Sequence, residues 1–100
     1  MFILELTYTA ELARIDEALA EHVAWLEAQY AAGAFLASGR KVPRDGGVIV
    51  AVGQDRAAIE ALVATDPFAR LGLAEYRVTE FVATVTASAL QAYRQQPPAS

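Results

Sequence analysis

The hydrophobic and polar positions of the chain first alternate with a period of two, which is typical of a β-strand. Across residues 2–8, Phe2, Leu4 and Leu6 share one face, whereas Glu5 and Thr7 lie on the other. This segment is therefore predicted to be a strand that buries one face in the core of the protein.

The spacing of the apolar residues then changes to three and four, as expected for one face of an α-helix. The apolar stripe consists of Ile15, Leu19, His22, Leu26 and Tyr30. We expect one long amphipathic helix that begins between residues 11 and 14 and ends near Ala32. Gly33 suits the left-handed conformation that commonly follows the end of a helix.

Turn signals and apolar runs divide the rest of the chain into further strands and helices. The predicted strands are 35–42, 48–52 and 75–85. Asp55 is expected to cap a second helix, which must end before Pro67 because the residue that precedes a proline disfavours the α conformation. A short helix is predicted over 88–96, and residues 95–100 are expected to form a flexible tail.

The order of these elements is βαββαβ with an added C-terminal helix, the split βαβ or ferredoxin-like arrangement. The right-handed crossover rule places both long helices on one face of a four-stranded antiparallel sheet. The predicted fold class is α+β, with a single domain over residues 1–94. Because residues 48–52 are apolar on both faces, a second copy of the chain is expected to cover the other face of the sheet. The chain is thus predicted to be a homodimer.

The composition narrows the classes of function. The chain has 100 residues, 55% of them hydrophobic, and its net charge of -4 argues against binding along a phosphate backbone. It contains no cysteine, which excludes disulfides, thiolate nucleophiles and cysteine-bound zinc. No segment is typical of a signal peptide or a membrane helix, so we expect a cytoplasmic protein with no membrane or nucleic-acid partner.

His22, the only histidine, lies on the apolar stripe of the first helix, where burial and a carboxylate partner can tune an imidazole. Asp66, held by Pro67 and backed by Phe68, is its natural partner. Such a pair orients one tautomer and makes the other ring nitrogen a general base. The alternative is structural: the protein satisfies both ring nitrogens, and Asp66 binds local backbone amides. No second histidine completes a metal ligand set, so no metal or other cofactor is expected.

The second predicted strand carries candidate substrate-binding residues. Gly39 can let a ligand approach the backbone, and Ser38 offers a hydroxyl or its amide. Arg40 can bind a carboxylate of a small substrate. The competing interpretations are a bulge glycine and a solvated basic loop that includes Lys41 and Arg44.

Together, four segments resemble the YCII-related (YciI-like) family, which belongs to the dimeric α+β barrel superfamily. The segments are 22–26, 33–39, 47–50 and 66–68. The resemblance extends over residues 2–81, and it implies a ferredoxin-like monomer in a homodimer whose sheets form a barrel. It also implies a cleft with the family's His and Asp at His22 and Asp66, and its small-residue strand motif at Ser38 and Gly39.

The chain departs from many family members at Arg40, where a proline commonly follows the glycine, and at Glu80, where a proline often precedes the aromatic residue. These departures leave the substrate class open. We expect a general acid–base enzyme that uses His22 and Asp66, with Ser38, Gly39, Arg40 and Phe68 binding a small anionic molecule for elimination or isomerisation. The alternative is a non-catalytic module that binds a metabolite or a partner, in which His22 and Asp66 have a structural role.

Overall fold

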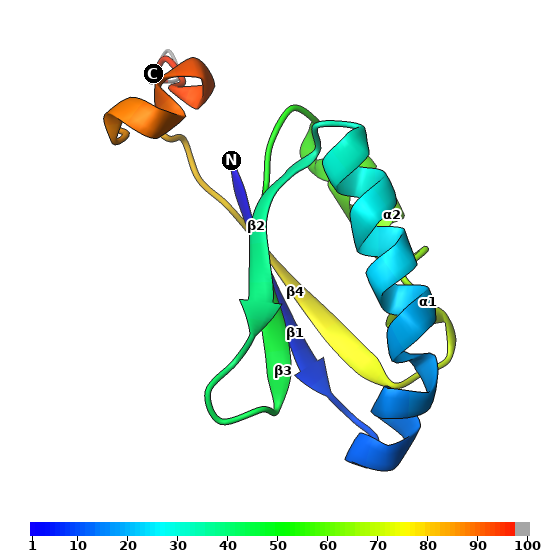
Figure 1. Cartoon of the computed structure of the whole chain (residues 1–100). Coiled ribbons are helices and arrows are strands. Elements are labelled where there is room, and N and C mark those ends of the chain that lie inside the picture. Colours follow the sequence, from blue (N-terminus) through cyan, green and yellow to red (C-terminus); the bar gives the residue numbers. More distant parts are fainter. Residues whose placement is uncertain (98–100) are drawn as a thin grey trace.

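Four antiparallel strands form one sheet with the order β2-β3-β1-β4 in the computed structural model, which describes residues 1–97. The strands are β1 (Phe2–Tyr8), β2 (Phe35–Arg40), β3 (Gly46–Ala51) and β4 (Ala74–Glu80). The helices are α1 (Leu12–Ala31), α2 (Arg56–Val63), α3 (Pro67–Arg70) and the short 3₁₀ helix η1 (Ser88–Tyr93). The predicted α+β fold and its βαββαβ order are thereby confirmed, and α1 and α2 lie on the same side of the sheet (Figure 1).

The ends of several elements differ from the prediction, and β4 differs most. It ends at Glu80 instead of residue 85, because Glu80 pairs with Phe2 at the start of β1 and no strand continues beyond that point. The hairpin between β2 and β3 lies two residues earlier in the chain than predicted, since β2 ends at Arg40 and β3 begins at Gly46. In β4, the apolar pattern of the sequence continues after Glu80, but β1 begins at Phe2 and has no further strand residue to pair with it.

The C-terminal segment leaves the sheet beside the N-terminus and lies away from α1 and α2 (Figure 1). Helix η1 is shorter than the predicted 88–96. Gln95, the first residue of the predicted tail, accepts hydrogen bonds from the backbone N–H of Ala83 and from the N-terminal amine of Met1. The last part of that predicted tail, residues 98–100, lies outside the described residues.

The face of the sheet toward the helices carries the main core. Phe2, Leu4 and Leu6 of β1 are almost fully buried there, as their alternation predicts. They pack with buried apolar side chains of the helices and of the neighbouring strands, among them Ile15, Ile49, Ile59 and Phe68. The long connector between β3 and β4 is therefore held by the same core as the strands.

The opposite face of the sheet carries a mixture of apolar and charged side chains. Ile3 pairs with Val50 and Glu5 pairs with Val48, so these four residues share that face, and all four are half-buried. Lys41 forms an ion pair with Glu5 at 3.0 Å. This face, away from the helices, is the one that the sequence predicts a second copy to cover.

Gly46, at the start of β3, gives a test of the strand packing. A Cβ atom on Gly46 would overlap the backbone carbonyl of Leu6 in β1, whereas a Cβ on Gly39 would meet nothing within 4 Å. We predict that Gly46→Ala lowers the free energy of unfolding by about 3 kcal/mol or more, because two paired backbones must separate. Urea denaturation measures this difference. The matched control Gly39→Ala should change stability by less than about 1 kcal/mol, and equal effects of the two changes would contradict the described register.

Candidate active site

The carboxylate of Asp66 is fully buried and accepts three hydrogen bonds. Asp66 is the N-cap of α3, where its Oδ1 accepts from the backbone N–H of Phe68 at 3.0 Å, and Pro67 fixes the start of that helix. Its Oδ1 also lies 2.8 Å from Nδ1 of His22. The hydroxyl of Tyr76 donates to Oδ2 at 2.5 Å. The pairing of His22 with Asp66 expected from the sequence is therefore present.

This hydrogen-bond pattern indicates which ring nitrogen of His22 carries a hydrogen. An ionised carboxylate only accepts hydrogen bonds, so Nδ1 of His22 must carry its hydrogen toward Asp66. In the neutral ring, Nε2 is then the acceptor. Among residues 1–97, no group forms a hydrogen bond with that Nε2. Burial, followed by the negative charge of Asp66, raises the pKa of the Tyr76 hydroxyl, which therefore stays protonated and donates.

Aromatic side chains fix the plane of the His22 imidazole. Its ring stacks on Phe68 with the centroids 4.0 Å apart and the planes 8° from parallel. Trp25, one turn further along α1, lies 6.0 Å away at 26°, and its indole N–H donates to the hydroxyl of Thr65 at 2.9 Å. The imidazole is thus held by one hydrogen bond and by apolar packing, so the His22 side chain has little freedom to rotate.

A cavity of about 130 Å³ lies beside His22, between α1 and the half of the sheet formed by β2 and β3. Its apolar wall is made by residues of α1 and β1, namely Leu19, Val23, Leu26, Leu6 and Tyr8. His22, Ser38, Gly39, Arg40 and Phe68 also line it. The cavity reaches the surface, because several of its lining residues are exposed. An apolar cavity of comparable size holds a single benzene ring.

The structure brings five of the six predicted site residues to this cavity, whereas the carboxylate of Asp66 lies behind His22. The side chain of Arg40 forms no hydrogen bond or ion pair with the part of the chain that the structure describes. Its basic neighbours are paired, since Lys41 contacts Glu5 and Arg44 contacts Asp16 at 2.6 Å. Lys41 and Arg44 are thus half-buried and ion-paired, which a wholly solvated basic loop would not be, whereas Arg40 is exposed at the mouth of the cavity.

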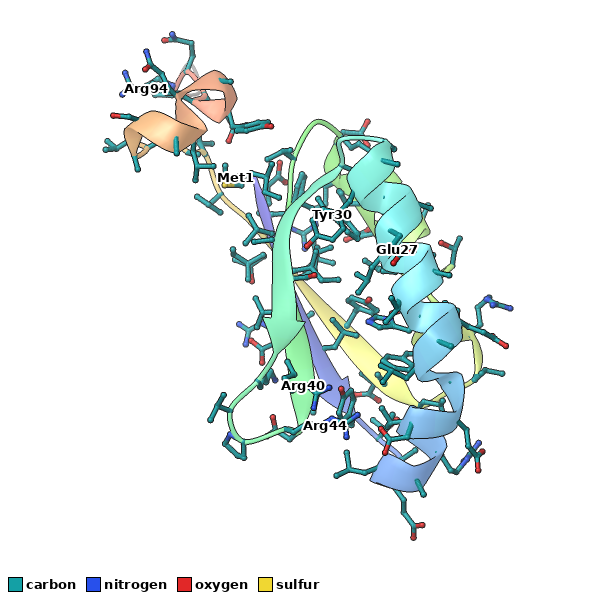
Figure 2. The ribbon with its side chains drawn as sticks, in the orientation of Figure 1. Met1, Glu27, Tyr30, Arg40, Arg44 and Arg94 are labelled. Atoms are coloured by element: carbon teal, nitrogen blue, oxygen red, sulfur yellow. The ribbon has the colours of Figure 1, made fainter. Side chains whose placement is uncertain are left out.

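Figure 2 shows Arg40 and Arg44 extending from the β2–β3 hairpin toward α1, with Tyr30 further along the same helix. The hydroxyl of Tyr30 lies 2.7 Å from that of Ser38, which orients the Ser38 side chain toward α1. Ser38 is therefore held as a hydrogen-bonding group on the cavity wall.

Tyr76 is the site residue that sequence reasoning did not assign to the histidine–aspartate pair. It lies opposite Leu6 in the sheet, on the face that packs against the helices. In the sequence it has the spacing of an ordinary core aromatic residue. The only signal in the sequence was that Tyr76 lies on the core-facing side of its strand, and it shares that feature with several other residues.

The fold and the site together define an α+β protein in which a helix histidine and a buried aspartate meet beside a small cavity. The model of the YCII-related domain matches residues 1–82, and the chain therefore belongs to the YCII-related family. None of the curated proteins matches this chain.

One solved structure similar to this chain is 5-chloro-2-hydroxyhydroquinone dehydrochlorinase from Burkholderia phenoliruptrix AC1100, in complex with 2,5-dihydroxybenzoquinone. The TM-score is 0.64 and the identity 21%, with 81% of this chain and 93% of that chain covered. This similarity supports the α+β fold. No helix within residues 1–97 is long and apolar enough to cross a membrane.

The three hydrogen bonds to Asp66 predict a large loss of stability in Asp66→Ala. The change leaves buried donors of His22 and Tyr76 without an acceptor and removes the cap of α3, which we expect to cost about 3–5 kcal/mol. Chemical denaturation measures the difference. Asp55→Ala is the matched control, because Asp55 caps α2 through a single exposed hydrogen bond to Ala58, worth about 1 kcal/mol. Similar losses for the two variants would contradict this account of Asp66.

Proposed function

We propose that this protein is a small homodimeric enzyme in which His22 acts as a general acid or base on a small anionic molecule. One observation carries the proposal. The imidazole of His22 lines the cavity, while its Nδ1 is bound to a carboxylate that is buried behind it. This arrangement matches that of a general base, because the carboxylate orients the ring and stabilises the imidazolium that forms when Nε2 takes a proton.

The chemistry that fits these groups is proton abstraction from a carbon next to a carbonyl. Nε2 of His22 takes the proton, and the electron pair of the C–H bond moves to form an enolate. In an elimination the enolate expels a leaving group with its electron pair, whereas in an isomerisation His22 returns the proton to another atom. Arg40 and the hydroxyl of Ser38 can stabilise the negative charge on the oxygen.

The proposed substrate is a single-ring organic anion. The cavity of about 130 Å³ supports this size, and the free guanidinium of Arg40 at its mouth supports the charge. The similar dehydrochlorinase binds 2,5-dihydroxybenzoquinone, a single ring with acidic hydroxyl groups. Dehydrochlorination is itself an elimination, so the proposal extends a related chemistry to this chain. A cytoplasmic location, expected from the sequence, is part of the proposal.

Binding of 2,5-dihydroxybenzoquinone tests the role of Arg40. We expect the wild type to bind this probe and Arg40→Ala to bind it about tenfold more weakly or worse, because a hydrogen bond to a charged group contributes about 1.5–3 kcal/mol. Isothermal titration calorimetry measures both affinities. Arg14→Ala, which removes an exposed arginine of α1 that does not line this cavity, is the control and should bind as the wild type does. Equal affinity in the Arg40→Ala variant would contradict the assigned contact.

Exchange of the ring C–H of the same probe for deuterium tests the role of His22. In D₂O the wild type should accelerate exchange, and His22→Gln should slow it by about 10²–10⁴-fold, the usual contribution of general acid–base catalysis. Nuclear magnetic resonance follows the loss of the proton signal. If the probe binds but the wild type does not accelerate exchange, the result favours the non-catalytic binding module over the enzyme.

The homodimer is the second part of the proposal, supported by the half-buried Ile3, Val48 and Val50 on the face opposite the helices. We expect light scattering to give the mass of a dimer, and Val48→Asp to give a monomer, because it places a second carboxylate beside Glu5 in the proposed interface. Val42→Asp is the matched control, since Val42 lies in the hairpin and is 97% exposed. A wild-type monomer, or two variants with the same mass, would contradict the proposed interface.

A further inference from the structure

Tyr76 contacts the oxygen of Asp66 that His22 does not use. Its hydroxyl donates to Oδ2 at 2.5 Å, while Oδ1 faces His22 and the amide of Phe68. Within residues 1–97, no other hydrogen bond to Oδ2 is present. The hydrogen bonds therefore form a chain from Tyr76 through the carboxylate to the imidazole, and each end of that chain comes from a different element of the fold.

We propose that Tyr76 is a positioning residue of the acid–base pair: its hydrogen bond to Asp66 limits how strongly the carboxylate attracts the proton on Nδ1 of His22. It thereby sets the pH range in which Nε2 of His22 accepts a proton. The importance of this effect for catalysis rests on the proposed function. The effect of Tyr76 on the protonation of His22 does not depend on that function.

The physical reason lies in the charge that the two carboxylate oxygens share. A donor on Oδ2 draws negative charge toward that oxygen and weakens Oδ1 as an acceptor. Without the donor, Oδ1 attracts the Nδ1 proton more strongly, and the imidazolium form of His22 becomes more favourable. Because Asp66 is fully buried, solvent does not replace the lost hydrogen bond without a structural change.

The Tyr76 hydroxyl is suited to this role because it remains a donor. Burial first, and then the charge and hydrogen bond of Asp66, raise its pKa above the ordinary value. A hydroxyl that lost its proton within the pH range in which the protein works would no longer donate to Asp66 over that whole range. Tyr76 thus supplies a constant hydrogen bond to the carboxylate that also contacts His22.

Other charged and titratable groups lie on the elements around the pair. They include Tyr8 on β1, Arg40 on β2, Arg56 on α2 and Arg70 on α3, besides acidic groups such as Glu21 on α1 and Glu75 on β4. Arg56 donates to the carbonyl of Val78, and Arg70 donates to that of Thr65. None of these groups forms a hydrogen bond with the pair in the described part of the chain. The change Tyr76→Phe leaves all of them in place, so it isolates the hydroxyl.

The single histidine of this chain makes the test direct, because the imidazole signals in a nuclear magnetic resonance titration belong to His22 alone. We expect the titration midpoint of His22 to rise by about half a pH unit or more in Tyr76→Phe. The pH profile of deuterium exchange into 2,5-dihydroxybenzoquinone should move upward by the same amount. Tyr93→Phe, which removes a hydroxyl in η1, is the matched control and should leave the midpoint unchanged.

A second measurement keeps the test informative if Tyr76→Phe does not fold. Replacing all tyrosines by 3-fluorotyrosine makes each hydroxyl a stronger donor, so the midpoint of His22 should fall. A midpoint that is unchanged or moves in the opposite direction in the folded variant would overturn the inference. If the midpoints move as expected and no exchange is catalysed, the inference stands and the proposed function fails. Catalysed exchange without any shift of the midpoint refutes the inference alone.

Discussion

The carboxylate of Asp66 is a negative charge placed inside the main core of a small domain, and the site depends on how that charge is satisfied. The donors come from α1 through His22, from α3 through the backbone of Phe68, and from β4 through Tyr76. A buried charge without partners costs several kcal/mol, so these three elements must hold their relative positions in the folded state. The same hydrogen bonds therefore stabilise the packing and orient the imidazole.

This constraint explains why a histidine on the buried side of a helix is available for chemistry. Asp66 fixes one edge of the ring, and Phe68 covers one of its faces. The ring also lines a cavity whose other wall is the β2–β3 half of the sheet. Arg40 supplies a positive charge at the mouth of that cavity, apart from the buried negative charge. The fold thus separates the group that orients the histidine from the groups that can hold a ligand.

The sequence predicted the order of elements, the burial of His22 and its pairing with Asp66, because periodicity and a proline-fixed turn are local signals. It also predicted that Ser38 and Arg40 lie near His22. The role of Tyr76 was not predictable, since a strand residue with core spacing has the same pattern whether or not its hydroxyl meets a carboxylate. The end of β4 was not predictable either, because it depends on where β1 begins.

The carboxylate of Asp66 holds the neutral His22 ring with the hydrogen on Nδ1, which leaves the lone pair on Nε2. The most direct test is a long-range ¹H–¹⁵N correlation spectrum of the uniformly labelled wild type above the titration midpoint of its single histidine. We expect the pattern of the Nδ1–H tautomer, with Nε2 as the unprotonated nitrogen. A spectrum of the Nε2–H tautomer, or of two tautomers in rapid exchange, would contradict it.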